Sequence, residues 1–130
     1  MNRIVADADI IIDHLRDKTE TFLELQRLHS QAEIELIIPT VVAVQLISGS
    51  ETRDKNKLNR IKAIFATTSI VELDLEISHI AGELLRDYPR MSDLADAVIA
   101  ATALHLSAKL STRNKKDFEF VEGLKFYEGI

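Results

Sequence analysis

Two short acidic motifs, far apart in the chain, each place a carboxylate beside a strongly apolar segment. The first is VADADIIID at residues 5–13, where Asp7 follows an apolar run; the second is DAVIAATA at residues 96–103, which begins with Asp96. A carboxylate in apolar surroundings is costly unless a positive charge compensates it. Because Mg²⁺ and Mn²⁺ prefer oxygen ligands, the two motifs predict a fold that brings them together at one metal site.

Short apolar runs alternate with amphipathic segments along the chain. This pattern predicts strands at residues 4–6, 36–38, 70–73, 109–111 and 125–127, and helices at residues 9–15, 19–31, 41–48, 51–65, 75–86 and 93–106. Thr40 and Ser92 are the expected N-caps of two of these helices, and Gly49 the expected end of the first of them. A short helix is also expected within residues 114–121. The alternation predicts one domain, residues 1–130, with a three-layer α/β/α sandwich around a central parallel sheet.

In open α/β sheets, ligands bind beyond the carboxyl ends of the strands. Asp7 follows the first predicted strand, and Thr112, Arg113 and Asn114 follow the fourth. We therefore expect these residues to lie at the same edge of the sheet.

Composition excludes several classes of function. The chain has no cysteine, which excludes disulfides and thiolate zinc sites and agrees with an expected cytoplasmic location. No segment approaches the roughly 20 apolar residues that span a bilayer, and the N-terminus lacks a signal-peptide pattern. The net charge of −5 argues against nucleic-acid binding by bulk attraction. Any nucleic-acid partner must be held by local basic groups or by metal ions.

The acidic residues also have ordinary structural explanations. Asp7 and Asp117 could cap the segments that follow them, whereas Asp93 and Asp96 could stabilise the start of a helix. We favour a shared metal site for Asp7, Asp96 and Asp117 because all three fall at predicted strand ends or helix starts.

Two further aspartates lie in the first motif. Asp9 and Asp13 are predicted to be solvated positions of the first helix, although Asp9 is close enough to Asp7 to reach a water on the metal.

Three segments of the chain resemble a known family. Residues 7–13 resemble the first motif of PIN domains, residues 96–103 the third, and TRNKKDF at residues 112–118 the fourth. The similarity is strongest to VapC-type toxins of prokaryotic toxin–antitoxin pairs. It implies an Mg²⁺- or Mn²⁺-dependent ribonuclease that cleaves RNA with a metal-activated water, a small antitoxin that blocks the site, and a homodimer. The matching positions imply Asp7, Asp96 and Asp117 as catalytic metal ligands, completed by Asn114.

The second family motif departs from the pattern. The family places a glutamate on the helix after the second strand, whereas the matching segment, PTVVAVQLISG at residues 39–49, has Gln45 there. Glutamine keeps an oxygen ligand but removes a charge, and hard cations bind more tightly as ligand charge increases. We therefore expect Gln45 to be a weak metal ligand that limits activity. Ala8 also replaces the hydroxyl residue that is common in the first motif.

Basic residues near the fourth motif are the candidate RNA contacts. Arg113, Lys115 and Lys116 lie within it and could hold phosphates. Arg86 and Arg90 precede the third motif. The basic cluster at residues 53–62 is more simply explained as a solvated helix face.

Two other functions remain open on the sequence. A PIN-like domain without the glutamate could bind RNA or an antitoxin without cutting. The Asp7-Ala8-Asp9 segment also fits the Asp-x-Asp motif of haloacid-dehalogenase-type phosphatases, in which the first aspartate is a nucleophile. That family requires Thr or Val shortly after the second aspartate, where this chain has Ile10 and Ile11. The phosphatase reading would also leave the Asp96 helix unexplained.

Overall fold

Five parallel strands form one sheet in the computed structural model, which describes residues 1–129. The strands are β1 (Asn2–Ala6), β2 (Ile34–Pro39), β3 (Ser69–Val71), β4 (Lys109–Ser111) and β5 (Lys125–Phe126), in the order β3-β2-β1-β4-β5. Val5 at the centre of β1 pairs with Ile37 of β2 on one side and with Leu110 of β4 on the other. The first strand in the sequence, β1, is therefore the central strand of the sheet.

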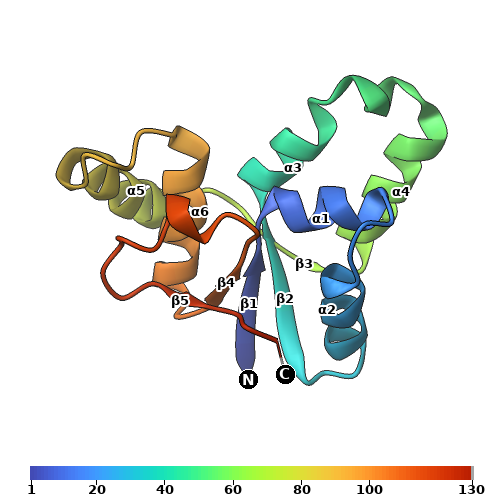
Figure 1. Cartoon of the computed structure of the whole chain (residues 1–130), viewed down its shortest axis with the longest axis horizontal. Helices are drawn as coiled ribbons and strands as arrows, with labels where there is room; N and C mark the ends of the chain where they lie inside the picture. Colours follow the sequence, from blue (N-terminus) through green and yellow to red (C-terminus); the bar gives the residue numbers. More distant parts are fainter. Residues whose placement is uncertain (130) are drawn as a thin grey trace.

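Helices cover both faces of the sheet, which confirms the predicted three-layer sandwich. Figure 1 shows α5 (Leu75–Asp87) and α6 (Leu94–His105) on one side of the strands, and α1 (Ala8–Leu15), α2 (Thr21–Ser30) and α4 (Lys55–Ala66) on the other. Helix α3 (Thr40–Ile47) contacts both α1 and α6, and two short 3-10 helices are η1 (Ser50–Arg53) and η2 (Lys115–Asp117). None of the helices in residues 1–129 is long and apolar enough to cross a membrane.

The core lies between β1, β2 and α6. Val5 and Leu36 are completely buried in the sheet, and residues 97–101 of α6 are buried on every side of the helix. Four of the seven residues at 97–103 are alanine, so α6 can approach both the sheet and α5 closely. This packing fixes the start of α6, where Asp96 lies, close to the carboxyl end of β1.

The two predicted N-caps are wrong, and each has a physical reason. Asp93, rather than Ser92, caps α6, because its carboxylate accepts a hydrogen bond from the Asp96 amide at 2.9 Å. Thr40 is the first residue of α3 and follows the extended residue Pro39; its hydroxyl instead accepts the amide of Leu73 at 3.3 Å.

The predicted helix at residues 51–65 is divided in two. The break falls at Asp54, whose carboxylate accepts the Asn56 amide at 2.8 Å and so starts α4 as a separate helix. Residues 118–121 form turns rather than a helix. Asp117 consequently caps no helix in that segment, and its capping explanation is removed.

Candidate active site

Asp7 lies at the carboxyl end of β1 and is buried, with an exposed fraction of 7%. It caps α1, because Oδ1 accepts the Ala8 amide at 2.7 Å. Its other oxygen, Oδ2, accepts the Thr112 hydroxyl from the residue after β4 at 2.8 Å. The two neighbouring strands β1 and β4 therefore bring the first and fourth motifs together, as the sequence predicted for this edge of the sheet.

Asp9 is held by the same loop after β4. Its Oδ2 accepts the Arg113 amide at 3.1 Å, the Asn114 side-chain amide at 3.0 Å and the Thr112 hydroxyl at 3.3 Å. Its Oδ1 is buried and has no hydrogen-bond partner within residues 1–129. Asp9 is thus half-buried rather than solvated, because the loop of the fourth motif covers it.

Asp13 was also predicted to be solvated, and this prediction is wrong. Its exposed fraction is 4%, and its Oδ1 forms an ion pair with Arg113 Nη1 at 2.7 Å. The cation that permits its burial comes from a residue 100 positions later, which helix periodicity could not reveal.

Asp96 faces an open hollow at the start of α6. The hollow, of about 500 Å³, is also lined by Asp93, Asp117, Arg90 and Lys116. No hydrogen bond formed within residues 1–129 ends on the Asp96 carboxylate. Asp96 of the third motif and Asp117 of the fourth therefore line the same hollow, and no hydrogen bond within residues 1–129 joins their carboxylates.

Burial and mutual repulsion perturb the two central carboxylates. Burial, together with repulsion from Asp93, Asp7, Asp117 and Asp9, raises the pKa of Asp96 to about 7. Burial and the neighbouring charges of Asp9 and Asp117 raise the pKa of Asp7 to about 6, although its hydrogen bonds act in the opposite direction. Each carboxylate thus lies in the field of the others. Shifts of this kind are concentrated at functional sites.

The donor atoms fit a hard divalent cation. Within residues 1–129 no three acidic or histidine side chains are close enough to form a complete metal site by themselves. The buried Oδ1 of Asp9 and Oε1 of Gln45, however, have no hydrogen-bond partner in this part of the chain. Unpaired buried oxygens and mutually repelling carboxylates are both stabilised by a cation that prefers oxygen ligands.

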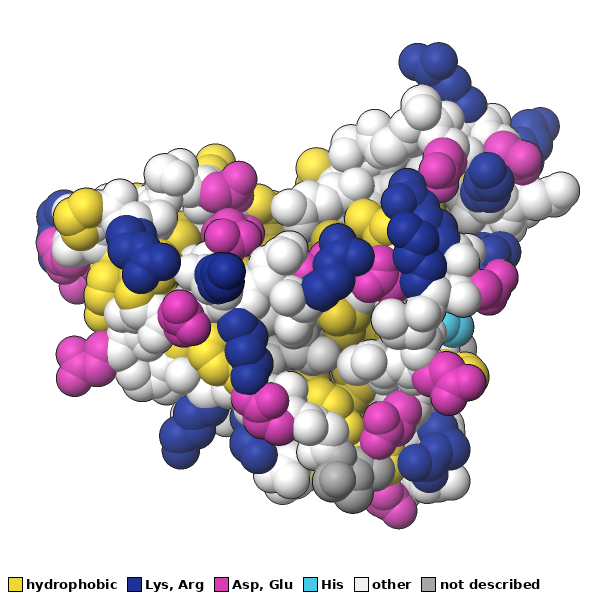
Figure 2. Space-filling model, in the orientation of Figure 1, with side chains coloured by type: hydrophobic (Ala, Val, Ile, Leu, Met, Phe, Trp, Pro, Cys, Tyr) yellow, Lys and Arg dark blue, Asp and Glu magenta, His cyan; other side chains and the backbone are white. Residues whose placement is uncertain are grey.

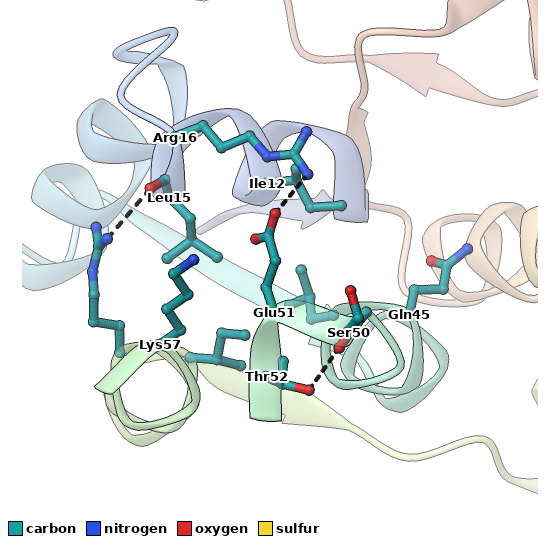
Figure 3. A pocket seen from close by; sticks show the side chains of 12 residues that line it. Ile12, Leu15, Arg16, Gln45, Ser50, Glu51, Thr52 and Lys57 are labelled. Atoms are coloured by element: carbon teal, nitrogen blue, oxygen red, sulfur yellow. Dashed lines mark hydrogen bonds and ion pairs between the residues drawn. The ribbon is translucent and has the colours of Figure 1, made fainter. Parts of the chain in front are cut away.

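Gln45 lies on α3, at the edge of a separate groove and not in the hollow that contains Asp96. Figure 3 shows its side-chain amide pointing away from Glu51 and out of that groove. Gln45 therefore lines the groove, and neither Gln45 nor Asn114 lines the hollow that contains Asp96.

The predicted RNA contacts have different surroundings. Arg113 is paired with Asp13, whereas Lys115 is paired with Glu128 and lies over the ring of Phe126. Lys116 lines the hollow beside Asp96. Figure 2 shows basic and acidic side chains interspersed over the face in view, which has no continuous basic surface.

The sequence did not predict that the Thr112 side chain contacts two carboxylates of this site. Its hydroxyl contacts both Asp7 and Asp9, and it also accepts the Asn114 amide at 3.1 Å. The available signal was its place in the fourth motif directly after a buried strand.

Comparisons with known proteins agree with this architecture. The PIN domain family model matches residues 4–124. Ribonuclease VapC1 of Methanocaldococcus jannaschii is 32% identical over 98% of this chain and 88% of its own length, and Ribonuclease VapC10 of Mycobacterium tuberculosis is 31% identical over 94% of this chain and 90% of its own.

Solved structures show the same fold at lower sequence identity. The DNA-bound VapBC structure from Salmonella typhimurium has a TM-score of 0.82 at 19% identity, covering 98% of both chains. VapBC2 from Rickettsia felis, bound to a promoter DNA fragment, has a TM-score of 0.76 at 19% identity and covers 96% of this chain and 97% of that chain. The family match over nearly the whole chain shows that this protein belongs to the PIN domain family and to its VapC type.

Proposed function

We propose that this chain is a divalent-metal-dependent endoribonuclease of the VapC type, inhibited by a small antitoxin protein. The observation that carries the proposal is the group of mutually repelling carboxylates at the carboxyl edge of the sheet, in which the pKa values of Asp7 and Asp96 are both raised. The names of the similar proteins, Ribonuclease VapC1 and VapC10, support RNA as the substrate.

Some residues of the site would bind the metal ion, and others hold the metal ligands in place. Asp7 and Asp96 would be the principal ligands of Mg²⁺ or Mn²⁺, with Asp117 beside them and amide oxygens from Asn114 and Gln45. An ion held there would supply Lewis-acid chemistry, polarising the scissile phosphate and lowering the pKa of a water molecule. The loop of the fourth motif holds Asp7 and Asp9 in place through its own hydrogen bonds.

Substrate phosphates require cations beside this acidic site. Lys116 and Arg90 line the hollow that contains Asp96, and Lys115 follows in the same 3-10 helix. These three side chains are our proposed phosphate contacts, because charged side chains near the reacting phosphate position the backbone of the strand.

The experiment is an RNA-cleavage assay with a structured substrate such as tRNA, in Mg²⁺ or Mn²⁺ and with an EDTA control. We expect weak metal-dependent cleavage by the natural chain, stronger cleavage by Gln45→Glu, and none by Asp96→Asn in that background. Cleavage that persists in EDTA would contradict the metal-dependent mechanism.

A second candidate function is supported by Gln45 itself. Loss of one ligand charge could leave a PIN-like domain that binds RNA or an antitoxin without cutting. The same variants distinguish the two candidates: if Gln45→Glu binds RNA but does not cleave it at any metal concentration, the binding function replaces the enzymatic one.

A groove beside Gln45 is our proposed docking surface for the antitoxin. It has a volume of about 350 Å³ and an apolar lining that comes from three helices: Ile12, Leu15, Leu46 and Ile61. At its rim, Arg16 pairs with Glu51 at 3.3 Å, while Lys57 lies nearby (Figure 3). An apolar segment with acidic flanking residues fits this combination. Two of the helices that line the groove, α1 and α3, begin at the carboxyl edge of the sheet, where Asp7 lies.

The antitoxin proposal can be tested with the protein encoded by any small reading frame directly upstream. Complex formation should inhibit cleavage, and Lys57→Glu, at an exposed residue of the groove rim, should weaken the complex without changing cleavage by the free toxin. An inhibitory complex that Lys57→Glu leaves intact would place the partner elsewhere.

A second copy of the chain is the proposed cover for an exposed apolar surface on α3 and the start of α6. Val44, Ile47 and Leu94 are 64%, 43% and 68% exposed, and the two helices are in contact. We expect a dimer by sedimentation at tens of micromolar (roughly the range where weak dimers appear), and a monomer for Val44→Asp. A natural chain that remains monomeric at this concentration would contradict self-association.

A further inference from the structure

The Asp13 carboxylate is buried, yet the proposed function gives it no task. Its side chain is 6% exposed and forms an ion pair with the half-exposed Arg113 at 2.7 Å. Burial of a carboxylate requires a well-placed cation, so the contact with Arg113 explains how Asp13 is tolerated. The remaining question is what this pair contributes to the site beside it.

Arg113 is attached to α1 at two points. Its guanidinium pairs with Asp13, and its backbone amide donates to Asp9 Oδ2 at 3.1 Å. Asp9 and Asp13 are four residues apart on α1, so they lie on the same side of that helix. A single residue of the loop after β4 therefore spans one turn of α1.

The residues on either side of Arg113 supply the other contacts to the acidic site. Thr112 donates its hydroxyl to Asp7 at 2.8 Å, and Asn114 donates its side-chain amide to Asp9 at 3.0 Å. A displacement of Arg113 would consequently move the donors from this loop that hold Asp7 and Asp9.

We propose that the Asp13–Arg113 ion pair is a positioning clamp, which fixes the loop 112–114 against Asp7 and Asp9, and that Arg113 is not a phosphate contact. Two observations favour this assignment. The guanidinium is already directed to a buried carboxylate, and separating them to reach RNA would leave that carboxylate without its counter-ion.

The two assignments of Arg113 predict opposite effects of Asp13→Asn. If Arg113 were an RNA contact, removal of Asp13 would free the guanidinium and leave RNA binding unchanged or tighter. If the pair is a clamp, Asp13→Asn weakens the site as much as Arg113→Gln does, because either change releases the loop.

The first measurement is amide hydrogen exchange in EDTA, which depends neither on a metal nor on RNA cleavage. We expect the Arg113 and Asn114 amides to exchange at least about tenfold faster in Asp13→Asn and in Arg113→Gln, the factor that corresponds to loss of one charge-assisted hydrogen bond. The Asp7 amide, which donates to Ser111 O at 3.0 Å within the sheet edge, is the internal reference. Arg3→Gln, at the exposed Arg3–Glu35 pair between β1 and β2, is the matched control and should leave both amides unchanged.

The second measurement is Mn²⁺ affinity by calorimetry, and this part rests on the proposed function. Each single variant should bind Mn²⁺ about tenfold more weakly, and the double variant Asp13→Asn/Arg113→Gln no more weakly than either, because both changes break one interaction. The double variant also leaves no buried charge uncompensated, so it should fold even if a single variant does not.

Unchanged exchange at Arg113 and Asn114 in the folded double variant would overturn the clamp. So would a rise in KM for RNA that is confined to Arg113→Gln, with Asp13→Asn unaffected. Failure of the natural chain to bind Mn²⁺ would instead count against the proposed function, while the exchange measurement would still decide the clamp.

Discussion

Asp7 caps α1 and Asp96 lies in the first turn of α6, but the protein holds their carboxylates in different ways. Both oxygens of Asp7 accept hydrogen bonds, from Ala8 and from Thr112. Asp96 faces an open hollow, no hydrogen bond within residues 1–129 ends on its carboxylate, and the Asp93 cap adds a like charge. The Asp7 half of the site is therefore organised by the protein's own hydrogen bonds, whereas the Asp96 half is destabilised by repulsion between like charges.

The largest expected effect separates these two halves. In the Gln45→Glu background, Asp96→Asn should abolish Mn²⁺-dependent cleavage, by at least about 100-fold, since about 2.7 kcal/mol of lost attraction gives that factor. In EDTA it should leave the free energy of unfolding unchanged or higher, because a repelled charge is removed and no hydrogen bond is lost.

Asp7→Asn is the matched change in the organised half. It should also abolish cleavage, but it should leave the protein about 1–3 kcal/mol less stable than Asp96→Asn does, because both changes remove a disfavoured charge and only Asp7 loses an acceptor oxygen that is hydrogen-bonded. Urea unfolding in EDTA compares the two variants. Equal destabilisation by both would show that the halves do not differ in this way.

The next effect concerns Gln45, whose Oε1 is buried without a partner in the described residues. Gln45→Glu adds a charge that is worth at most about 4 kcal/mol to an ion at about 4 Å, with an effective dielectric constant of about 20. We expect Mn²⁺ affinity to rise by at least about tenfold and cleavage to rise with it. If calorimetry shows the same affinity and the RNA assay the same rate, Gln45 does not occupy the metal-binding position of the second motif.

A smaller effect is the pH dependence of stability in EDTA. The folded-state pKa values of Asp7 and Asp96, about 6 and about 7, are raised above the ordinary 3.8. Between the ordinary pKa of 3.8 and the raised pKa of each group, the folded protein binds more protons than the unfolded protein. The contribution of these groups to stability is therefore present below about pH 4 and is lost as the pH rises to about 7.

The variant Asp96→Asn isolates one of these groups. The melting temperature of the variant minus that of the natural chain should increase from pH 4 to pH 7 and then stay constant. A difference that is independent of pH, or that grows toward acid, would contradict the raised pKa of Asp96.

The smallest effect tests the hydrogen bond from Thr112 to Asp7. This bond lowers the pKa of Asp7 against the opposing effect of burial. Thr112→Val should therefore raise that pKa further and weaken Mn²⁺ binding by about three- to tenfold, whereas Thr112→Ser should keep both. Carboxyl titration by NMR measures the pKa directly, and equal values in Val and Ser variants would exclude the hydrogen bond as its cause.

Strands β1 and β2 could be predicted from sequence because each ends in a short apolar run followed by a polar residue. Asp7 after β1 and Thr112 after β4 fall at the same edge because these two strands are parallel neighbours. Helix starts were less predictable: both Ser92 and Asp93 are good caps by composition, and only the reach of the Asp93 carboxylate to the Asp96 amide decides between them.

Long-range pairs were the least predictable part of the site. The sequence pattern predicts Asp13 to be a solvated position on a helix, yet its ion pair with Arg113, 100 residues away, allows it to be buried. The same pair changes the interpretation of Arg113, which the motif presents as a free cation. Periodicity reports which face of a helix is apolar, but it does not report which loop covers that face.

The most direct test of the shared metal site is anomalous diffraction from crystals soaked in Mn²⁺, recorded near the manganese absorption edge. We expect a peak in contact with carboxylate oxygens of both Asp7 and Asp96, and loss of that peak in Asp96→Asn crystals. A peak held by Asp93 and Asp117 without Asp7, or one that persists unchanged in Asp96→Asn, would contradict it.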